Sequence, residues 1–163
     1  MSRIPQLGAR GEGWVLLQLA AIALVALAGR REPGVSTMDP GLRSLLDATG
    51  SLLLVMSAVL ILSGVLVLKR GAAFSVLPRP ISGGRLVETG PYRIVRHPVY
   101  AGLILGGIGF ALQRMSPATL VATMLLAVVL DLKRRREEVW LLDRFPGYAA
   151  YRKRTRALVP FLY

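Results

Sequence analysis

Four long stretches without Asp, Glu, Lys or Arg dominate the hydropathy pattern of this chain. They cover 13–29, 48–68, 97–113 and 115–130, with only Arg114 between the last two. A bilayer core about 30 Å thick is crossed by a helix of roughly 17 to 25 residues. The second stretch meets this length comfortably, the first just meets it, and the last two are shorter. The pattern predicts an all-α, polytopic membrane bundle of about four transmembrane helices, in which the last two form a hairpin.

The basic residues gather at the ends of these stretches. The 163-residue chain has a formal net charge of +12, and most of its Lys and Arg fall near the amino end, in 69–96 and in 133–156. Because Lys and Arg accumulate on the cytoplasmic side of membrane proteins, we expect an integral protein of the inner or plasma membrane, with its active site and both termini facing the cytoplasm. The residues that oppose this orientation are Arg30, Arg31, Arg43 and Arg114.

The composition narrows the classes of function. A basic chain suggests nucleic acid as a partner, but no recognition motif accompanies the charge, so we predict none. Membrane lipids are the partners that the pattern favours. The chain has no cysteine and a single histidine, which excludes disulfides and thiolate chemistry and leaves only carboxylates as further metal ligands. We therefore predict no metal site.

A long loop and a charged helix follow the second stretch. We expect an irregular loop up to the third stretch, because this segment is rich in Pro and Gly. Loops of this length in compact chains are usually functional or disordered. The fourth helix is predicted to continue through 131–145, to break at Pro146 and Gly147, and to resume beyond them. Gly102 and Gly106 predict a close helix-packing face. The turn-forming residues of the loop are Pro78, Pro80, Gly83, Gly84, Gly90 and Pro91.

The only histidine lies in "TGPYRIVRHPVYAG", at the start of the third stretch. Proline is favoured at the first position of a helix, where its missing N–H would be unpaired anyway. Pro98 therefore predicts a helix start with His97 as its N-cap. The free N–H groups and the dipole of that helix end, reinforced by Arg96, favour an anion. Under the alternative interpretation, Tyr92 and Arg93 merely anchor the chain at the membrane interface.

Two adjacent acids, Glu137 and Glu138, interrupt the basic run after the fourth stretch. The simplest interpretation is a solvated helix with an ion pair between Arg134 and Glu138, four residues apart. The predicted hairpin, however, brings this run to the same end of the bundle as His97. Cationic donors on one side and carboxylates on the other suit a ligand that carries both charges, such as an amino-acid zwitterion.

Together these segments resemble the isoprenylcysteine carboxyl methyltransferase family, which is related to the membrane phospholipid methyltransferases. The resemblance extends over 83–163 and consists of Arg-His-Pro-x-Tyr, an apolar hairpin and Glu-Glu. It implies transfer of a methyl group from S-adenosyl-L-methionine to a lipophilic acceptor, in a pocket closed by the carboxyl-terminal segment. The family usually has Phe-Gly-x-x-Tyr where this chain has "FPGY", a departure that bears on the substrate more than on the cofactor.

The resemblance also implies roles for individual residues. It places His97, with Arg96 and Pro98, near the carboxylate of the cofactor. Glu138, together with Glu137, is expected to bind the cofactor's ammonium group. Tyr100 would line the pocket, and Gly90 and Pro91 would shape the backbone beneath the cofactor. Tyr92 would contact the substrate. Arg134 would be the catalytic residue that meets the acceptor.

Two other functions remain open on the sequence. An NADPH-dependent lipid or sterol reductase would need a basic pocket for the 2′-phosphate, for which Arg135, Arg136 and Arg152 are candidates. A non-catalytic membrane subunit would use the same motifs as interface anchors. Methyl transfer needs mainly proximity and a dry, oriented site, and therefore little from individual side chains. The sequence accordingly leaves two acceptor groups open, a carboxylate and an amine.

We predict one domain over 1–163. Its two amino-terminal helices lie in 1–70, and the cofactor-binding loop, the hairpin and the carboxyl-terminal helices lie in 71–163. The first stretch, which ends near "ALA" at 26–28, also fits a cleaved signal peptide as an alternative to an uncleaved helix. The oligomeric state is not determined by these patterns.

Overall fold

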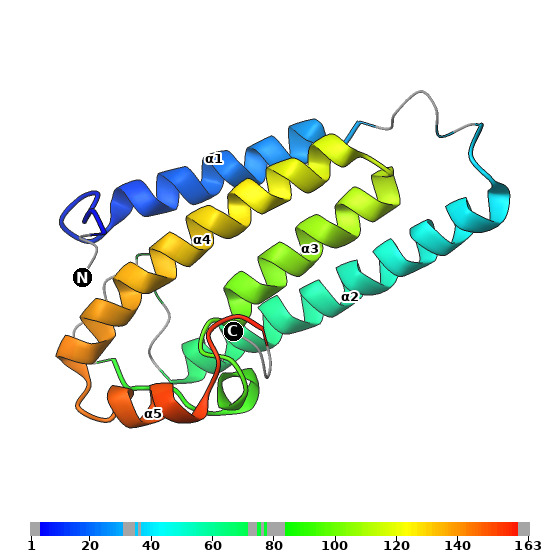
Figure 1. Ribbon diagram of the computed structural model, residues 1–163. Helices are drawn as coiled ribbons and strands as arrows, with labels where there is room; N and C mark the ends of the chain where they lie inside the picture. Colours follow the sequence, from blue (N-terminus) through cyan, green and yellow to red (C-terminus); the bar gives the residue numbers. More distant parts are fainter. Residues whose placement is uncertain are drawn as a thin grey trace.

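The computed structural model describes residues 4–30, 35, 37–71, 75, 77 and 84–159. Within these residues the regular structure is helical, apart from an isolated parallel bridge between Val95 and Arg156. Four long helices run side by side, and a short one lies at one end of the bundle (Figure 1). The predicted all-α class is confirmed. The elements are α1 (Glu12–Ala28), α2 (Pro40–Arg70), the 3-10 helix η2 (Gly90–Arg93), α3 (Pro98–Arg114), α4 (Pro117–Arg144) and α5 (Tyr148–Arg154).

The helix starts follow local capping chemistry. The Asp39 side chain accepts a hydrogen bond from the N–H of Leu42 over 2.9 Å, and Pro40 opens α2. Because this cap is good, α2 begins eight residues before the apolar stretch that predicted it, so the preceding loop is shorter than expected. His97 is the N-cap of α3 and Pro98 its first residue, as predicted, although the imidazole makes no capping hydrogen bond.

The long helices pack in the order α1, α4, α3, α2 across the bundle (Figure 1). The predicted hairpin of α3 and α4 is therefore confirmed. The predicted glycine face lies against α2: a Cβ atom on Gly102 would approach Ile61 Cγ1 to 2.6 Å, and one on Gly109 would approach the Gly50 carbonyl oxygen to 2.8 Å. Ser57 Oγ also donates a 2.7 Å hydrogen bond to the Gly102 carbonyl. The small residues thus allow backbones to approach closely.

Polar contacts join α1 to α4 at both ends of their interface. At one end, the Thr119 hydroxyl donates to the Ala28 carbonyl oxygen over 2.9 Å. At the other end, Lys133 Nζ donates to Gln18 Oε1 over 2.6 Å. The apolar core of the described residues lies between these contacts and is centred on Leu126 and Leu130. α1 is thereby fixed along α4 on the side away from α2.

α2 is the one helix among the described residues that is both long and apolar enough to cross a membrane. α1 is a shorter apolar helix of 17 residues, and α3 has the same length. α4 has 28 residues, but its carboxyl-terminal part is highly charged. The structure thus shows an all-helical protein with one membrane-length helix. The prediction of about four crossings, made from the four uncharged stretches, stays a prediction.

The remaining segments agree with the expected pattern. The fourth helix continues to Arg144, and α5 begins at Tyr148 after the predicted break. The loop before α3 contains η2, which the sequence did not predict. Gly90 starts η2 with a φ of 60°, a left-handed conformation that favours glycine. The turns predicted at Pro78, Pro80 and Gly83 and the charges of Arg3 and Arg31 lie outside the described residues.

Candidate active site

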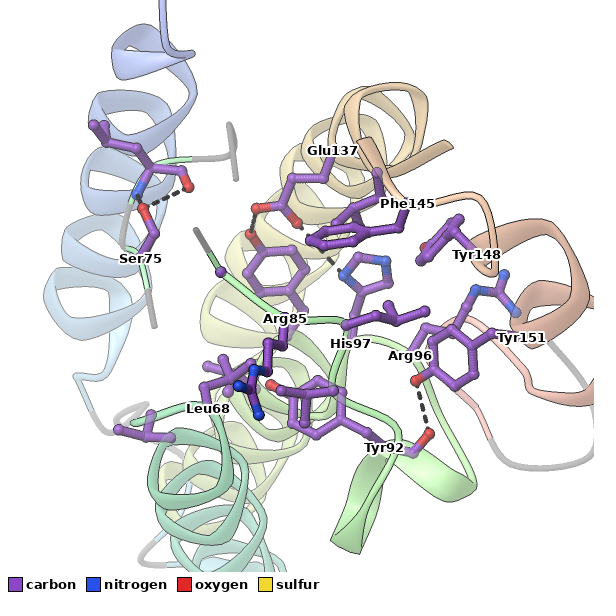
Figure 2. Close-up of a pocket in the computed structure, with 18 of the residues that line it drawn as sticks. Leu68, Ser75, Arg85, Tyr92, Arg96, His97, Glu137, Phe145, Tyr148 and Tyr151 are labelled. Carbon is purple, nitrogen blue, oxygen red and sulfur yellow. Dashed lines mark hydrogen bonds and ion pairs between the residues drawn. The ribbon is translucent and has the colours of Figure 1, made fainter. Parts of the chain in front are cut away.

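A cavity of about 320 Å³ opens where the amino end of α3 meets the charged part of α4. Its walls come from all four long helices, from residues 84–87 and from the segment around α5. Figure 2 shows Glu137 from α4, His97 from the start of α3 and Tyr148 from α5 around this space. Aliphatic and aromatic side chains make up most of the remaining wall. Such a cavity, mostly apolar with a few converging polar groups, is typical of a small-molecule site.

The two adjacent glutamates occupy different environments. Glu137 lines the cavity, and its Oε1 accepts a 2.8 Å hydrogen bond from the Tyr100 hydroxyl. Glu138 is almost completely buried and does not line this cavity. Its Oε1 lies 3.0 Å from Arg96 Nε, and its Oε2 lies 3.3 Å from Arg152 Nε. Successive helix residues point about 100° apart, so one carboxylate faces the cavity while the other lies behind its wall.

His97 lies between these two carboxylates. Its Nδ1 is 3.5 Å from Glu137 Oε2, and its Nε2 is 3.3 Å from Glu138 Oε1. The second contact is an ion pair without hydrogen-bond geometry, because Nε2 has no hydrogen-bond partner among the described residues. The imidazole also stacks on the Tyr100 ring with a centroid distance of 5.4 Å. The predicted meeting of the histidine and the paired acids across the hairpin is therefore present.

The charges of this cluster shift its titration. Burial lowers the pKa of His97, but the nearby carboxylates of Glu137 and Glu138 outweigh this effect, so the net shift is upward. Burial raises the pKa of Glu138, whereas His97 and Arg96 lower it, and the result is a pKa of about 2. A protonated histidine and an ionised Glu138 stabilise each other within this wall.

The carboxyl-terminal segment closes the back of the site through its backbone. The N–H of Arg96 donates to the Arg156 carbonyl over 2.8 Å, and the N–H of His97 donates to the Ala157 carbonyl over 3.1 Å. The Arg96 guanidinium adds bonds to the carbonyls of Arg152 and Thr155. The residues before α3 are therefore held by the end of the chain, in agreement with the closing role that the family resemblance implied.

Aromatic residues form one wall of the cavity. Tyr92, at the centre of η2, is buried, and its carbonyl oxygen accepts a 2.7 Å hydrogen bond from the Tyr151 hydroxyl. The Tyr148 side chain is also buried, but its hydroxyl has no hydrogen-bond partner among the described residues. Burial is the main cause of an upward shift in the pKa of Tyr148, so this hydroxyl stays protonated. It is a donor available to a ligand.

Sequence reasoning did not assign a role to two polar residues that the structure brings to the cavity. Lys133 is 2% exposed, and its ammonium lies 5.1 Å from the centre of the Tyr100 ring. Gln18 lies on α1 and accepts the hydrogen bond from Lys133 described above. Both residues line the cavity. Gln18 is a lone amide within an otherwise apolar stretch, and this isolated polar side chain is the sequence feature that could have indicated its role.

The other residues with expected roles do not line the cavity. Arg134 is buried against Asp131 and Glu138, with Nη2 2.6 Å from Asp131 Oδ1 and Nη1 3.5 Å from Glu138 Oε1. The ion pair predicted between residues 134 and 138 is therefore present, and the catalytic role of Arg134 stays a prediction. Gly90 and Pro91 begin η2 and hold Tyr92 in place, and Pro98 is buried at the start of α3.

No group of three or more potential metal ligands, His, Cys, Asp or Glu, gathers anywhere in the described part of the chain. The side chains assigned to a nucleotide phosphate under the reductase hypothesis also lie apart from the cavity. Arg135 pairs with Asp131 over 2.7 Å, and Arg136 lies 4.5 Å above the Trp140 ring. Within the cavity wall itself, the main functional groups are carboxylate, imidazole, ammonium, guanidinium and phenol groups, the guanidinium groups being those of Arg85 and Arg96.

Comparison with known proteins identifies the class. The family model described as phospholipid methyltransferase matches residues 46–147, a range that contains most of α2, all of α3, both glutamates and His97. The chain belongs to the phospholipid methyltransferase family. It is also similar to the cobalt-zinc-cadmium resistance protein CzcN of Cupriavidus metallidurans, with 37% identity over 78 residues, which are 47% of this chain and 36% of that protein. The chain thus matches about a third of that relative's length. No solved structure matches significantly.

Proposed function

We propose that this protein is a membrane methyltransferase that uses S-adenosyl-L-methionine to methylate a lipophilic acceptor. Membership of the phospholipid methyltransferase family supports the reaction class. The observation that carries the proposal is the cavity in which Glu137, His97 and the Tyr148 hydroxyl, which has no hydrogen-bond partner in the described part of the chain, meet aromatic walls. When bound, the cofactor supplies an electrophilic methyl group on a sulfonium ion.

The residues of the cavity fit the charges of that cofactor. Glu137 would bind its ammonium group, because this carboxylate faces the cavity and is held by Tyr100. His97, in the protonated form that its two glutamates favour, and the N–H groups of the first turn of α3 would bind its carboxylate. The Tyr148 hydroxyl would donate to a further polar atom. Glu138, the other expected ammonium ligand, would act mainly by fixing His97 and Arg96.

The acceptor would approach the end of the cavity formed by Gln18 and Lys133. A carboxylate acceptor is ionised at neutral pH and needs no base, and the buried ammonium of Lys133 would attract it. The same ammonium would repel an amine acceptor in its protonated form. We therefore favour a lipophilic carboxylate over an amine. Arg134, which acts on Glu138 through their ion pair, would position the wall of the site.

We further propose that the bundle crosses the membrane and that the cavity faces the cytoplasm. The start of α1 and the carboxyl-terminal helix α5 lie at the same end of the bundle (Figure 1). The cavity lies there too, since residues of α5 line it. The basic residues of the carboxyl-terminal part of α4 and of α5 also lie at this end. This distribution agrees with the enrichment of Lys and Arg on cytoplasmic surfaces.

The test is direct binding followed by product identification. Calorimetry on the purified protein in a neutral detergent is expected to show binding of S-adenosylhomocysteine, with weaker binding in His97→Ala. The control Arg144→Gln, which changes an exposed arginine at the end of α4, should bind like wild type. Labelled methyl groups should then pass to a component of a total lipid extract, identified by its mass. A folded protein that binds NADPH but not S-adenosylhomocysteine would contradict the proposal.

A further inference from the structure

A second cavity lies on the other side of the wall formed by Arg96 and Glu138. Its volume is about 470 Å³, and it lies between the charged part of α4 and residues 152–157. Five arginines line it, and Glu138 is the only carboxylate in its wall among the described residues. The five are Arg96, Arg134, Arg135, Arg152 and Arg156.

The positive charge of this groove exceeds its internal compensation. Glu138 contacts three of the arginines, and Asp131 contacts Arg134 and Arg135. Among the described residues that line the groove or that these contacts join, five guanidinium groups face two carboxylates, a formal excess of three positive charges. The side chains of Arg135 and Arg152 are about half exposed, at 48% and 51%, so they can reach a ligand. Guanidinium groups bind phosphate oxygens in a planar, two-pronged geometry, which makes a phosphoryl group the ligand that suits this groove best.

The apolar surface beside the groove indicates what carries the phosphoryl group. Val139 and Leu142 line the groove and are 42% and 38% exposed. They continue an exposed apolar stripe along α4 at intervals of three or four residues, the spacing of one helix face. The members of this stripe are Val121, Met124, Val128 and Leu132, each exposed by 38% or more. In a membrane such a stripe contacts acyl chains. Arg135 lies one turn beyond Leu132, so the stripe leads directly to the arginines of the groove.

We propose that this groove is a binding site for an anionic phospholipid, whose phosphodiester lies among the arginines and whose acyl chains lie along the exposed stripe of α4. The site is separate from the cavity assigned to the methyl donor, because the Arg96–Glu138 pair stands between the two. It does not depend on the methyltransferase assignment. A free phosphate would use the arginines alone, whereas a lipid also uses the stripe.

The test compares two double variants that remove the same charge. Arg135→Gln/Arg152→Gln removes two exposed arginines from the groove. Arg144→Gln/Lys153→Gln removes two exposed basic residues from the same segments outside it. Binding of dihexanoyl phosphatidylglycerol to delipidated protein in a neutral detergent is measured by calorimetry, with dihexanoyl phosphatidylcholine and inorganic phosphate as the other titrants.

Wild type and the control variant are expected to bind phosphatidylglycerol more tightly than phosphatidylcholine. In the groove variant that binding should weaken about tenfold or more, since two charge-assisted contacts are lost. Equal weakening in both double variants would mean unspecific surface attraction and would overturn the proposal. Inorganic phosphate that binds as tightly as the lipid, and loses affinity in the groove variant, would overturn the lipid assignment in favour of a free phosphate site.

Discussion

The hydroxyl of Tyr100 donates a 2.8 Å hydrogen bond to Glu137, across the interface between α3 and α4. This bond holds the Glu137 carboxylate at the wall of the cavity. The neighbouring Glu138 is instead enclosed by arginine and histidine side chains. We therefore expect these two adjacent residues of the same type to have separable functions, one in ligand binding and one in holding the site together.

The first prediction concerns ligand binding. Glu137→Gln should weaken binding of S-adenosylhomocysteine about tenfold or more, because a charge-assisted contact becomes a neutral one. Tyr100→Phe should weaken it less, since the carboxylate remains but loses its fixed position. Calorimetry at neutral pH measures both, with circular dichroism as the check on folding. Unchanged affinity in folded Glu137→Gln would contradict this role and would mean that Glu138 binds the cofactor's ammonium group, as the sequence resemblance implied.

The second prediction concerns stability. Glu138→Gln leaves the Arg96 guanidinium and a protonated His97 without their shared carboxylate. Removal of one partner from a buried ion-pair cluster typically costs about 3–5 kcal/mol. The free energy of unfolding in detergent should therefore fall strongly. Asp143→Asn, which neutralises an exposed acid on the same helix, is the matched control and should change it little. Equal small effects would show that the cluster is not structural.

The third prediction concerns the dependence of stability on pH. Because the pKa of Glu138 is lowered to about 2, its stabilising contribution is complete above its ordinary pKa of 4.5 and is lost as the pH falls from there toward 2. The pKa of His97 is raised, so its contribution is complete below 6.5 and is lost as the pH rises through the raised value.

The apparent melting temperature should therefore be highest between about pH 4.5 and 6.5. His97→Gln should remove the decline that this histidine causes on the alkaline side, and Glu138→Gln should remove the acid-side decline caused by this carboxylate. Thermal unfolding followed by fluorescence at a series of pH values measures both. A His97→Gln protein with the same alkaline decline as wild type would contradict the assignment of the titrating group.

The fourth prediction separates two tyrosines of the aromatic wall. The Tyr148 hydroxyl is buried without a partner among the described residues, so Tyr148→Phe should leave the free protein as stable or more stable. The same variant should weaken binding of S-adenosylhomocysteine. Tyr151→Phe removes the bond to the Tyr92 carbonyl and should cost about 1–2 kcal/mol of stability. Denaturant unfolding and calorimetry on both variants test this; a destabilised Tyr148→Phe would mean that its hydroxyl is satisfied within the protein.

The fifth prediction concerns the close contact of α3 with α2. A Cβ atom on Gly109 would lie 2.8 Å from the Gly50 carbonyl oxygen and 3.0 Å from Leu53 Cβ, so the backbones must move apart. Gly109→Ala should lower the free energy of unfolding by about 1–3 kcal/mol. Gly147→Ala, where the nearest atom is 3.9 Å away, is the control and should have little effect. Equal stability of both variants would contradict the packing.

The sequence by itself determined the four long helices and predicted that His97 meets Glu137 and Glu138. Pro98 after His97 specified the start of α3, because proline suits only that position of a helix. The apolar stretches specified the hairpin, and the hairpin placed the histidine and the paired acids at one end. These inferences succeed because capping, periodicity and short connections are local properties of the chain.

Only the tertiary structure decided which side chains face the cavity. Successive residues on α4 point in directions about 100° apart, so only one of Glu137 and Glu138 can face the cavity. The packing of α3 and α5 against α4 decides that this residue is Glu137. In the same way, Lys133 and Gln18 come together because α1 lies along α4. Local sequence sets where a helix begins and ends, but contacts between distant segments set its rotation, and the rotation decides which residues form the site.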